Sequence, residues 1–192
     1  MISTGRPTAG AVAGVGEVGG SDDAQLVLPL LGHATPPVRA EAVRTLRRLE
    51  QATADVLFPM LNDASGRVVQ QVARTLRPVV GELNLDALRA LIVPENQRHT
   101  RTAAYKLLRE RDIYVRLAVD LQLMSDSSPG LAKRAKADVH DWLARVAPTA
   151  YEPPTGVLCD ELDHRLTQQQ AMLGQAMTRA LRFHLRMLPG SD

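Results

Sequence analysis

The segment VRAEAVRTL at residues 38–46 returns thirty residues later as VVQQVARTL at residues 68–76. The segments before them also correspond, because VLPLL at 27–31 aligns with LFPML at 57–61, including the proline. Self-similarity at a fixed period of about thirty residues is typical of repeat proteins. The middle of the chain is therefore predicted to be a repeat array.

The columns of the repeat indicate helices. Two weaker copies follow, TAAYKL at 102–107 and RAKADV at 134–139. One column holds Ala42, Val72, Ala103 and Ala135, and another, four positions on, holds Leu46, Leu76, Leu107 and Val139. A four-residue step keeps both columns on one helix face, which is therefore expected to be buried between neighbouring helices. A third column is expected to face solvent and holds Glu41, Gln71, Thr102 and Arg134.

Each copy is predicted to be two antiparallel helices, with proline or serine residues near the helix starts. The predicted pairs are 22–32 with 37–50, 53–62 with 65–81, 85–93 with 96–110, and 113–124 with 128–146. No sustained alternation of apolar and polar residues supports a strand. We therefore expect an all-α fold, a short α-solenoid of about four helix pairs with a C-terminal helical cap.

At these residues the chain resembles the HEAT repeat family, including its bacterial short form of the phycobilin lyase type. The family pattern has a proline inside the first helix, an Asp or Asn at its end, then Val-Arg, a small residue and a Leu. The first copy matches at Pro29, Val38, Arg39, Ala42 and Leu46, and the second at Pro59, Asn62, Asp63, Val68, Val72 and Leu76. The resemblance covers about residues 22–147 and implies helix packing rather than one activity.

The two ends of the sequence depart from the repeat. Residues 1–21 are rich in glycine and are expected to be a flexible leader. Gly14, Gly16 and Gly19 have the spacing of a dinucleotide fingerprint, but that motif works only between a buried strand and a helix. No strand is predicted there, so we expect no cofactor.

Residues 148–156 are predicted to be a linker, because Pro148, Pro153 and Pro154 break the pattern. Residues 157–188 are predicted to form a helical cap, with a short helix followed by a longer one that starts at a capping box of Thr167 and Gln170. The longer helix has an apolar stripe. The alternative to a cap is a helix that binds a partner or a membrane surface.

The composition restricts the class of protein. The chain has 192 residues, of which 45% are hydrophobic and only 3% aromatic, so the core must consist mainly of Leu, Val, Ala and Met. No apolar stretch approaches the roughly 18 residues that span a bilayer. The single cysteine excludes an internal disulfide framework. A cytoplasmic protein is expected.

No catalytic or metal-binding set is expected. The histidines are scattered, at positions 33, 99, 140, 164 and 184. The dipeptide His140-Asp141 is also found in HD phosphohydrolases, but it is too short to indicate that site. The group Asp160, Glu161, Asp163 and His164 could bind a divalent ion, although acidic residues in a first helical turn ordinarily complement the helix dipole.

An Arg-rich concave surface is the predicted binding site. In a solenoid of helix pairs, the second helices line the concave side. Their exposed columns are predicted to hold Arg44, Arg74 and Tyr105, then Arg48 and Arg109, then Gln70, Arg101 and Lys133. Arginine on a rigid scaffold favours carboxylates or phosphates. We expect a non-catalytic scaffold for a protein partner with an acidic surface.

Two alternatives stay open. The first is a nucleic-acid-binding protein, with chemistry like that of HEAT-like DNA glycosylases, for which Trp142 with Asp138 or Asp141 is the available set. The second concerns the first helix pair, which lacks an obvious polar cap, so the chain could be part of a longer array or form a dimer through that end.

Overall fold

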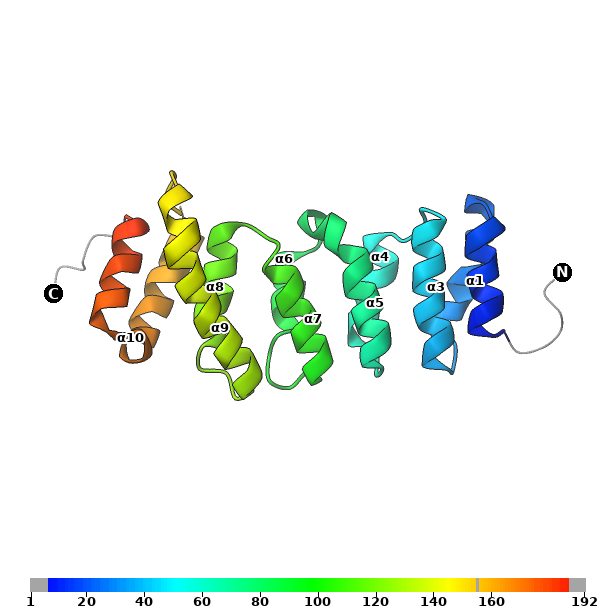
Figure 1. The fold of residues 1–192 in the computed structure, drawn as a ribbon, viewed down its shortest axis with the longest axis horizontal. Coiled ribbons are helices and arrows are strands. Elements are labelled where there is room, and N and C mark those ends of the chain that lie inside the picture. The colour runs from blue at the N-terminus through cyan, green and yellow to red at the C-terminus, as the bar shows by residue number, and fades with distance from the viewer. Residues whose placement is uncertain (1–6, 155, 187–192) are drawn as a thin grey trace. The chain divides into compact units, whose positions relative to one another are not determined.

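The computed structural model describes residues 7–154 and 156–186. Over these residues every regular element is a helix and none is a strand, which confirms the predicted all-α class. The chain divides into two compact units between Leu107 and Leu108. Figure 1 labels the α-helices in chain order.

The first unit contains short first helices and longer second helices. Its elements are α1 (Ala9–Val18), η1 (Ser21–Asp23), α2 (Ala24–Val27), η2 (Leu28–Gly32), α3 (Pro36–Arg48), α4 (Ala54–Leu57), η3 (Phe58–Asn62), α5 (Gly66–Leu76), η4 (Arg77–Glu82), α6 (Leu85–Ala90) and α7 (Arg98–Leu108), which ends at the boundary. In the first two repeats, the first helix changes from an α-helical to a 3₁₀ turn at Leu28 and at Phe58. Each change comes one residue before a proline, Pro29 or Pro59. Proline has no N–H to continue the α-helical ladder, so the helix tightens there.

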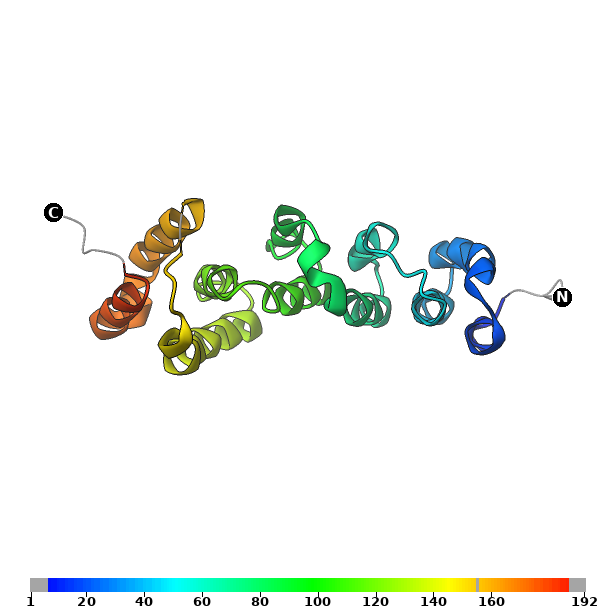
Figure 2. The same ribbon diagram turned by 90° about the horizontal axis from the view of Figure 1, so that it is seen from above.

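The second helices build the core of this unit. Helix α3 packs against α1 and α5, and Figure 2 shows these three helices in one row, with the first helices in another. Ala42 and Leu46 of α3 and Val72 and Leu76 of α5 are fully buried. The two predicted core columns are therefore confirmed in these helices.

The column that was expected to face solvent is buried in both of these helices. Glu41 is 7% exposed and Gln71 is 8% exposed. Their polar ends are satisfied locally, because Arg44 donates to Glu41 and the Gln71 Nε2 donates to the Thr75 Oγ1 over 3.4 Å. Variable polar residues therefore did not indicate solvent exposure, since a paired polar end allows the rest of the side chain to be buried.

The predicted flexible leader is wrong over Ala9–Val18, which form α1. Val12 is buried, and the Thr45 Oγ1 of α3 donates to the Val12 carbonyl over 3.0 Å. Gly16 lies so close to α3 that a Cβ there would stand 3.1 Å from the Thr45 Oγ1. Small residues thus let α1 pack where a preceding second helix would lie, and packing offsets the poor helix propensity of glycine. Residues 1–6 lie outside the described residues.

The second unit contains the fourth helix pair and the C-terminal helices. Its elements are α8 (Ile113–Leu123), α9 (Pro129–Asp141), the π-helical turn η5 (Trp142–Val146), η6 (Ala147–Thr149) and α10 (Val157–His184). Helix α8 packs against α9 and α10. Trp142 is fully buried, and its indole N–H donates to the Ile113 carbonyl over 3.0 Å.

Helix α10 is two helices joined at Gly174, whose φ of 76° and ψ of 159° are not helical. The predicted start at Thr167 is wrong, because Thr167 lies inside the first half and its Oγ1 donates to the Asp163 carbonyl. Glycine adopts a positive φ without steric cost, so the chain reverses there. The first half contacts α8, where the Gln169 Nε2 donates to the Ser125 Oγ over 2.9 Å.

The predicted linker is partly held by hydrogen bonds. Its first residues continue the helical turns through Thr149. The Tyr114 hydroxyl donates to the Glu152 carbonyl, and Pro154 is buried. The segment therefore lies against the second unit over these residues.

Candidate interaction surface

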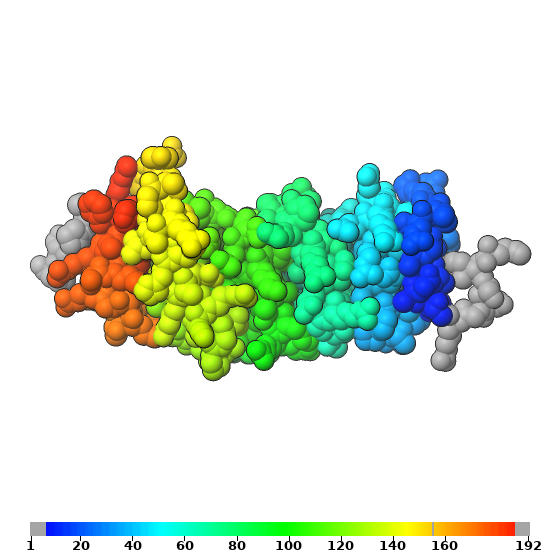
Figure 3. All heavy atoms as spheres, in the orientation of Figure 1, coloured from blue at the N-terminus to red at the C-terminus, as the bar shows by residue number. Residues whose placement is uncertain are grey.

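Helix α5 carries an exposed polar stripe. Arg67, Gln70 and Arg74 are exposed and follow one another at three- and four-residue steps, so they share one face. The helix contains no acidic residue. Among the described residues, neither Arg67 nor Arg74 makes an ion pair or a side-chain hydrogen bond. Figure 3 shows α5 beside α3 and α1 on one face of the first unit.

The arginines of the adjacent α3 are partly neutralised. Arg44 has an exposed side-chain fraction of 36% and pairs with Glu41 in the same helix. Arg48 is 40% exposed and lies 4.0 Å from Glu17 of α1. Both predicted residues are therefore accessible, but each has a carboxylate neighbour that the α5 arginines lack.

Two of the predicted surface residues are buried and do not belong to this surface. Tyr105 of α7 is fully buried, and Arg101 is only 5% exposed. The Arg101 Nε donates to the Ile92 carbonyl over 2.8 Å, so its guanidinium binds the turn after α6. An aromatic ring gains more from burial than from exposure, and a long arginine can bind a nearby carbonyl. The predicted row of Arg44, Arg74 and Tyr105 is therefore wrong at its third member.

The last two predicted residues lie in the second unit. Lys133 is exposed on α9. Arg109 is 30% exposed and its Nη2 lies 2.9 Å from Asp138 Oδ1. The structure thus places Arg44, Arg48 and Arg74 together in one unit, and Arg109 and Lys133 in the other.

A different arginine joins the first two repeats. Arg39 of α3 forms a bidentate ion pair with Asp63, at 2.7 Å for both nitrogens, and also donates to the His33 carbonyl over 2.8 Å. Asp63 in turn accepts from the Ser65 N–H over 2.7 Å. Both residues matched the repeat pattern in the sequence, but the ion pair between them was not predicted.

The electrostatics of this ion pair favour its charged form. Burial alone would raise the pKa of Asp63, but the hydrogen bonds from Arg39 and the Ser65 N–H outweigh it, so the pKa lies below its ordinary value. The hydrogen bond to Asp63 raises the pKa of Arg39. Arg39 is therefore committed to the packing of repeats and is not a candidate for partner binding.

Residues 24–109 match the family model for HEAT repeats. This part of the chain belongs to the HEAT repeat family. A search of the curated proteins finds no match to the chain. HEAT repeats generally mediate interactions between proteins, which is consistent with a scaffold. The finer resemblance to the phycobilin lyase type stays a prediction.

The residues of the glycosylase alternative do not form a site that could handle an extruded base. Trp142 is fully buried and cannot stack on an extruded base. Asp138 pairs with Arg109, and Asp141 pairs with Arg116 and Arg145. Such chemistry requires an accessible aromatic residue near an available carboxylate. The assignment of Trp142, Asp138 and Asp141 to a glycosylase site is therefore wrong, and these residues contribute to packing and ion pairs instead.

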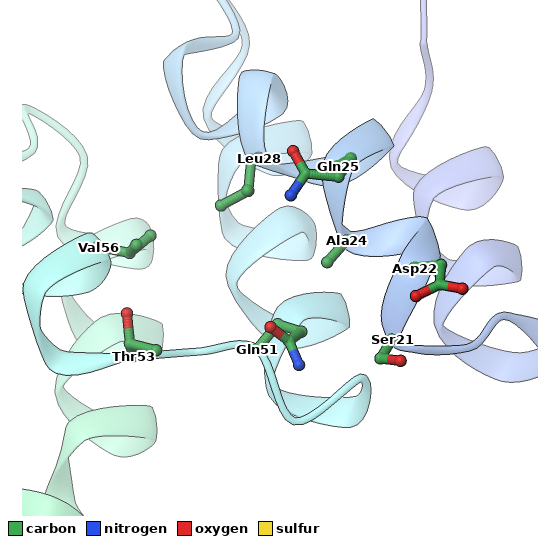
Figure 4. A pocket seen from close by; sticks show the side chains of 8 residues that line it. All are labelled: Ser21, Asp22, Ala24, Gln25, Leu28, Gln51, Thr53 and Val56. Atoms are coloured by element: carbon green, nitrogen blue, oxygen red, sulfur yellow. The ribbon is translucent and has the colours of Figure 1, made fainter.

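A surface hollow of about 440 Å³ lies between the first helices of the first two HEAT repeats. Figure 4 shows Gln25 and Leu28 from one repeat facing Thr53 and Val56 from the next. Asp22 is the one ionisable residue among those that line it. A single carboxylate without a base, nucleophile or second ligand supports no catalytic reaction.

Over residues 7–154 and 156–186, no group of three or more His, Cys, Asp or Glu side chains could hold a metal ion. No helix in the same residues is long and apolar enough to cross a bilayer.

Proposed function

We propose that this protein is a non-catalytic interaction scaffold that binds an acidic protein surface through the exposed face of α5 and α3. The contact residues are Arg67, Gln70 and Arg74 of α5, with Arg44 and Arg48 of α3 at the side. This set keeps Arg44, Arg48, Gln70 and Arg74 of the predicted surface. It leaves out the buried Arg101 and Tyr105, and Arg109 and Lys133 of the second unit.

The observation that carries the proposal is the pair of exposed α5 arginines without carboxylate partners. A partner that binds Arg67 or Arg74 therefore breaks no ion pair among the residues that the structure describes. A guanidinium binds a carboxylate through two parallel hydrogen bonds, and its position on a packed helix reduces the entropy lost on binding. Arg44 and Arg48 add positive potential beside them.

The chemistry of the face favours a protein over a nucleic acid. Helices α3 and α5 contain no aromatic residue, so this face offers no ring on which a base could stack. Gln70 can donate to and accept from a peptide group, which suits a protein backbone. The face therefore supplies charge and amide recognition without base readout.

The test begins with capture of a partner from native lysate and continues with its titration against the purified full chain. We expect Arg74→Glu to weaken binding by more than tenfold, or about 1.4 kcal/mol. Arg134→Glu is the matched control, because Arg134 is an exposed arginine on α9. Equal effects of the two reversals would contradict the proposal. A loss of about a thousandfold between 50 and 200 mM salt would instead indicate phosphate contacts.

A further inference from the structure

The second half of α10, residues 175–184, has an outward stripe unlike that of an ordinary solvated helix. Ala176, Arg179 and Phe183 are exposed at three- and four-residue steps, and Arg186 continues the series beyond the helix. The opposite face is the packed one, because Leu181 is fully buried. The helix therefore already buries an apolar face and still presents a phenylalanine between two arginines.

This region also holds the two most exposed aromatic side chains among the described residues. The chain has one Trp, three Tyr and two Phe. Phe183 is 77% exposed and Tyr151 is 79% exposed, whereas Tyr105, Tyr114 and Trp142 are buried. The Arg186 Nη2 donates to the Tyr151 carbonyl over 3.0 Å, which holds the Tyr151 segment beside the end of α10.

Two arginines beside Phe183 have no carboxylate partner among the described residues. Arg165 pairs with Glu161 at 2.9 Å, and Arg182 pairs with Asp163 at 3.0 Å. Both carboxylates belong to the first half of α10. Among the described residues, Arg179 makes no ion pair, and the one polar contact of the Arg186 side chain is with the Tyr151 carbonyl. An aromatic ring flanked by available guanidinium groups has the composition of binding hot spots.

We propose that Phe183, Arg179, Arg186 and Tyr151 form a second docking surface, whose occupant is an acidic amphipathic helix of a partner protein. Apolar side chains of that helix cover Phe183 and Tyr151, and its carboxylates pair with the two arginines. The surface lies in the second unit and shares no residue with the α5 and α3 face, so it does not depend on the proposed function.

Charge complementarity favours a protein occupant over an anionic membrane. Two arginines contribute about 1 kcal/mol each at an anionic bilayer, and stable membrane anchoring needs a stronger second signal than one phenylalanine on a short helix. The exposed Glu152 follows Tyr151 directly and would be repelled by anionic lipids. A folded partner can instead place its carboxylates away from Glu152.

The probe is a fluorescein-labelled amphipathic peptide of about 18 residues with leucines at helical spacing and glutamates beside them. Fluorescence anisotropy of this peptide is measured against the full chain, with a twin peptide that has lysine for every glutamate. We expect only the acidic peptide to bind, and Phe183→Ser and Arg179→Glu each to weaken binding at least tenfold. Arg134→Glu and Val18→Ser should leave binding unchanged, because Arg134 is exposed on α9 and Val18 is exposed in the first unit, outside both proposed surfaces.

Circular dichroism of Phe183→Ser and Arg179→Glu establishes that both variants are folded. Failure of the acidic peptide to bind would overturn the proposal, as would equal binding of the lysine twin or an equal loss with Arg134→Glu. Phe183-dependent sedimentation with phosphatidylserine vesicles would assign the surface to a membrane instead. A dimer in analytical ultracentrifugation that Phe183→Ser dissociates would assign it to a second copy, and this too contradicts the proposal.

Discussion

Helices α3 and α5 share the sequence pattern of the repeat, whereas α1 and α10 do not have this pattern. Leu46 and Leu76 occupy the same column and are both fully buried. Helix α1 is held by close approach of Gly16 to α3, and α10 is divided by Gly174. In α3 and α5, column position determines which of these leucines are buried. At the two ends, single glycines determine the packing and the chain direction.

The largest loss of stability is expected from truncating a buried leucine of the repeat helices α3 and α5. Leu76→Ala should lower the free energy of unfolding by about 2 to 5 kcal/mol, because it leaves a cavity in a fully buried column. Leu46→Ala should cost a similar amount if the two columns are equivalent. Val18→Ala is the control, since Val18 is 91% exposed. Chemical denaturation of the three variants measures this, and equal stabilities would show that the column is not a core column.

The next effect concerns the ion pair between repeats. Asp63→Asn should cost about 2 to 3 kcal/mol at neutral pH, because it leaves Arg39 without its carboxylate in a largely buried site. The folded-state pKa of Asp63 is lowered, so its contribution is complete above the ordinary aspartate pKa of about 4 and is lost as the pH falls through the folded-state value. Unfolding measured at several pH values should show the difference between parent and variant shrinking in acid. A difference that is constant with pH would refute the electrostatic explanation.

The smallest effect tests the ends. Gly174→Ala should cost about 1 to 2 kcal/mol, because an L-residue is strained at a φ of 76°. Gly14→Ala should be neutral or slightly stabilising, because it lies within α1 and a Cβ there has nothing within 4 Å. Thermal unfolding of both variants distinguishes them. Equal melting temperatures would mean that the break in α10 does not depend on glycine.

The sequence predicted the parts of the fold that depend on local periodicity. The columns of Ala42 and Leu46 indicated the helix pairs because a helix repeats its environment every three to four residues. The packing of α1 could not be predicted this way, because glycine disfavours helices and only contact with α3 compensates. Thr167 resembled a helix start, but nothing local excluded a continuous helix up to Gly174.

The candidate surface was predictable only in part. Arg74 is exposed as expected, because its column lies opposite the buried one on α5. The same column becomes buried at Tyr105, since burial on α7 depends on tertiary neighbours that the repeat pattern does not encode. The unpaired state of Arg67 and Arg74 likewise depends on where the carboxylates lie in space, which sequence spacing alone does not give.

The most direct test of the α5 surface is a charge-swap cycle with the captured partner. Each acidic residue of the partner's binding region is changed to Arg and titrated against the parent chain and Arg74→Glu. We expect one partner position at which the swapped pair recovers binding, with a coupling energy above about 1.4 kcal/mol. Strictly additive losses at every acidic position of the partner would show that Arg74 contacts no carboxylate and would contradict the proposed α5 surface.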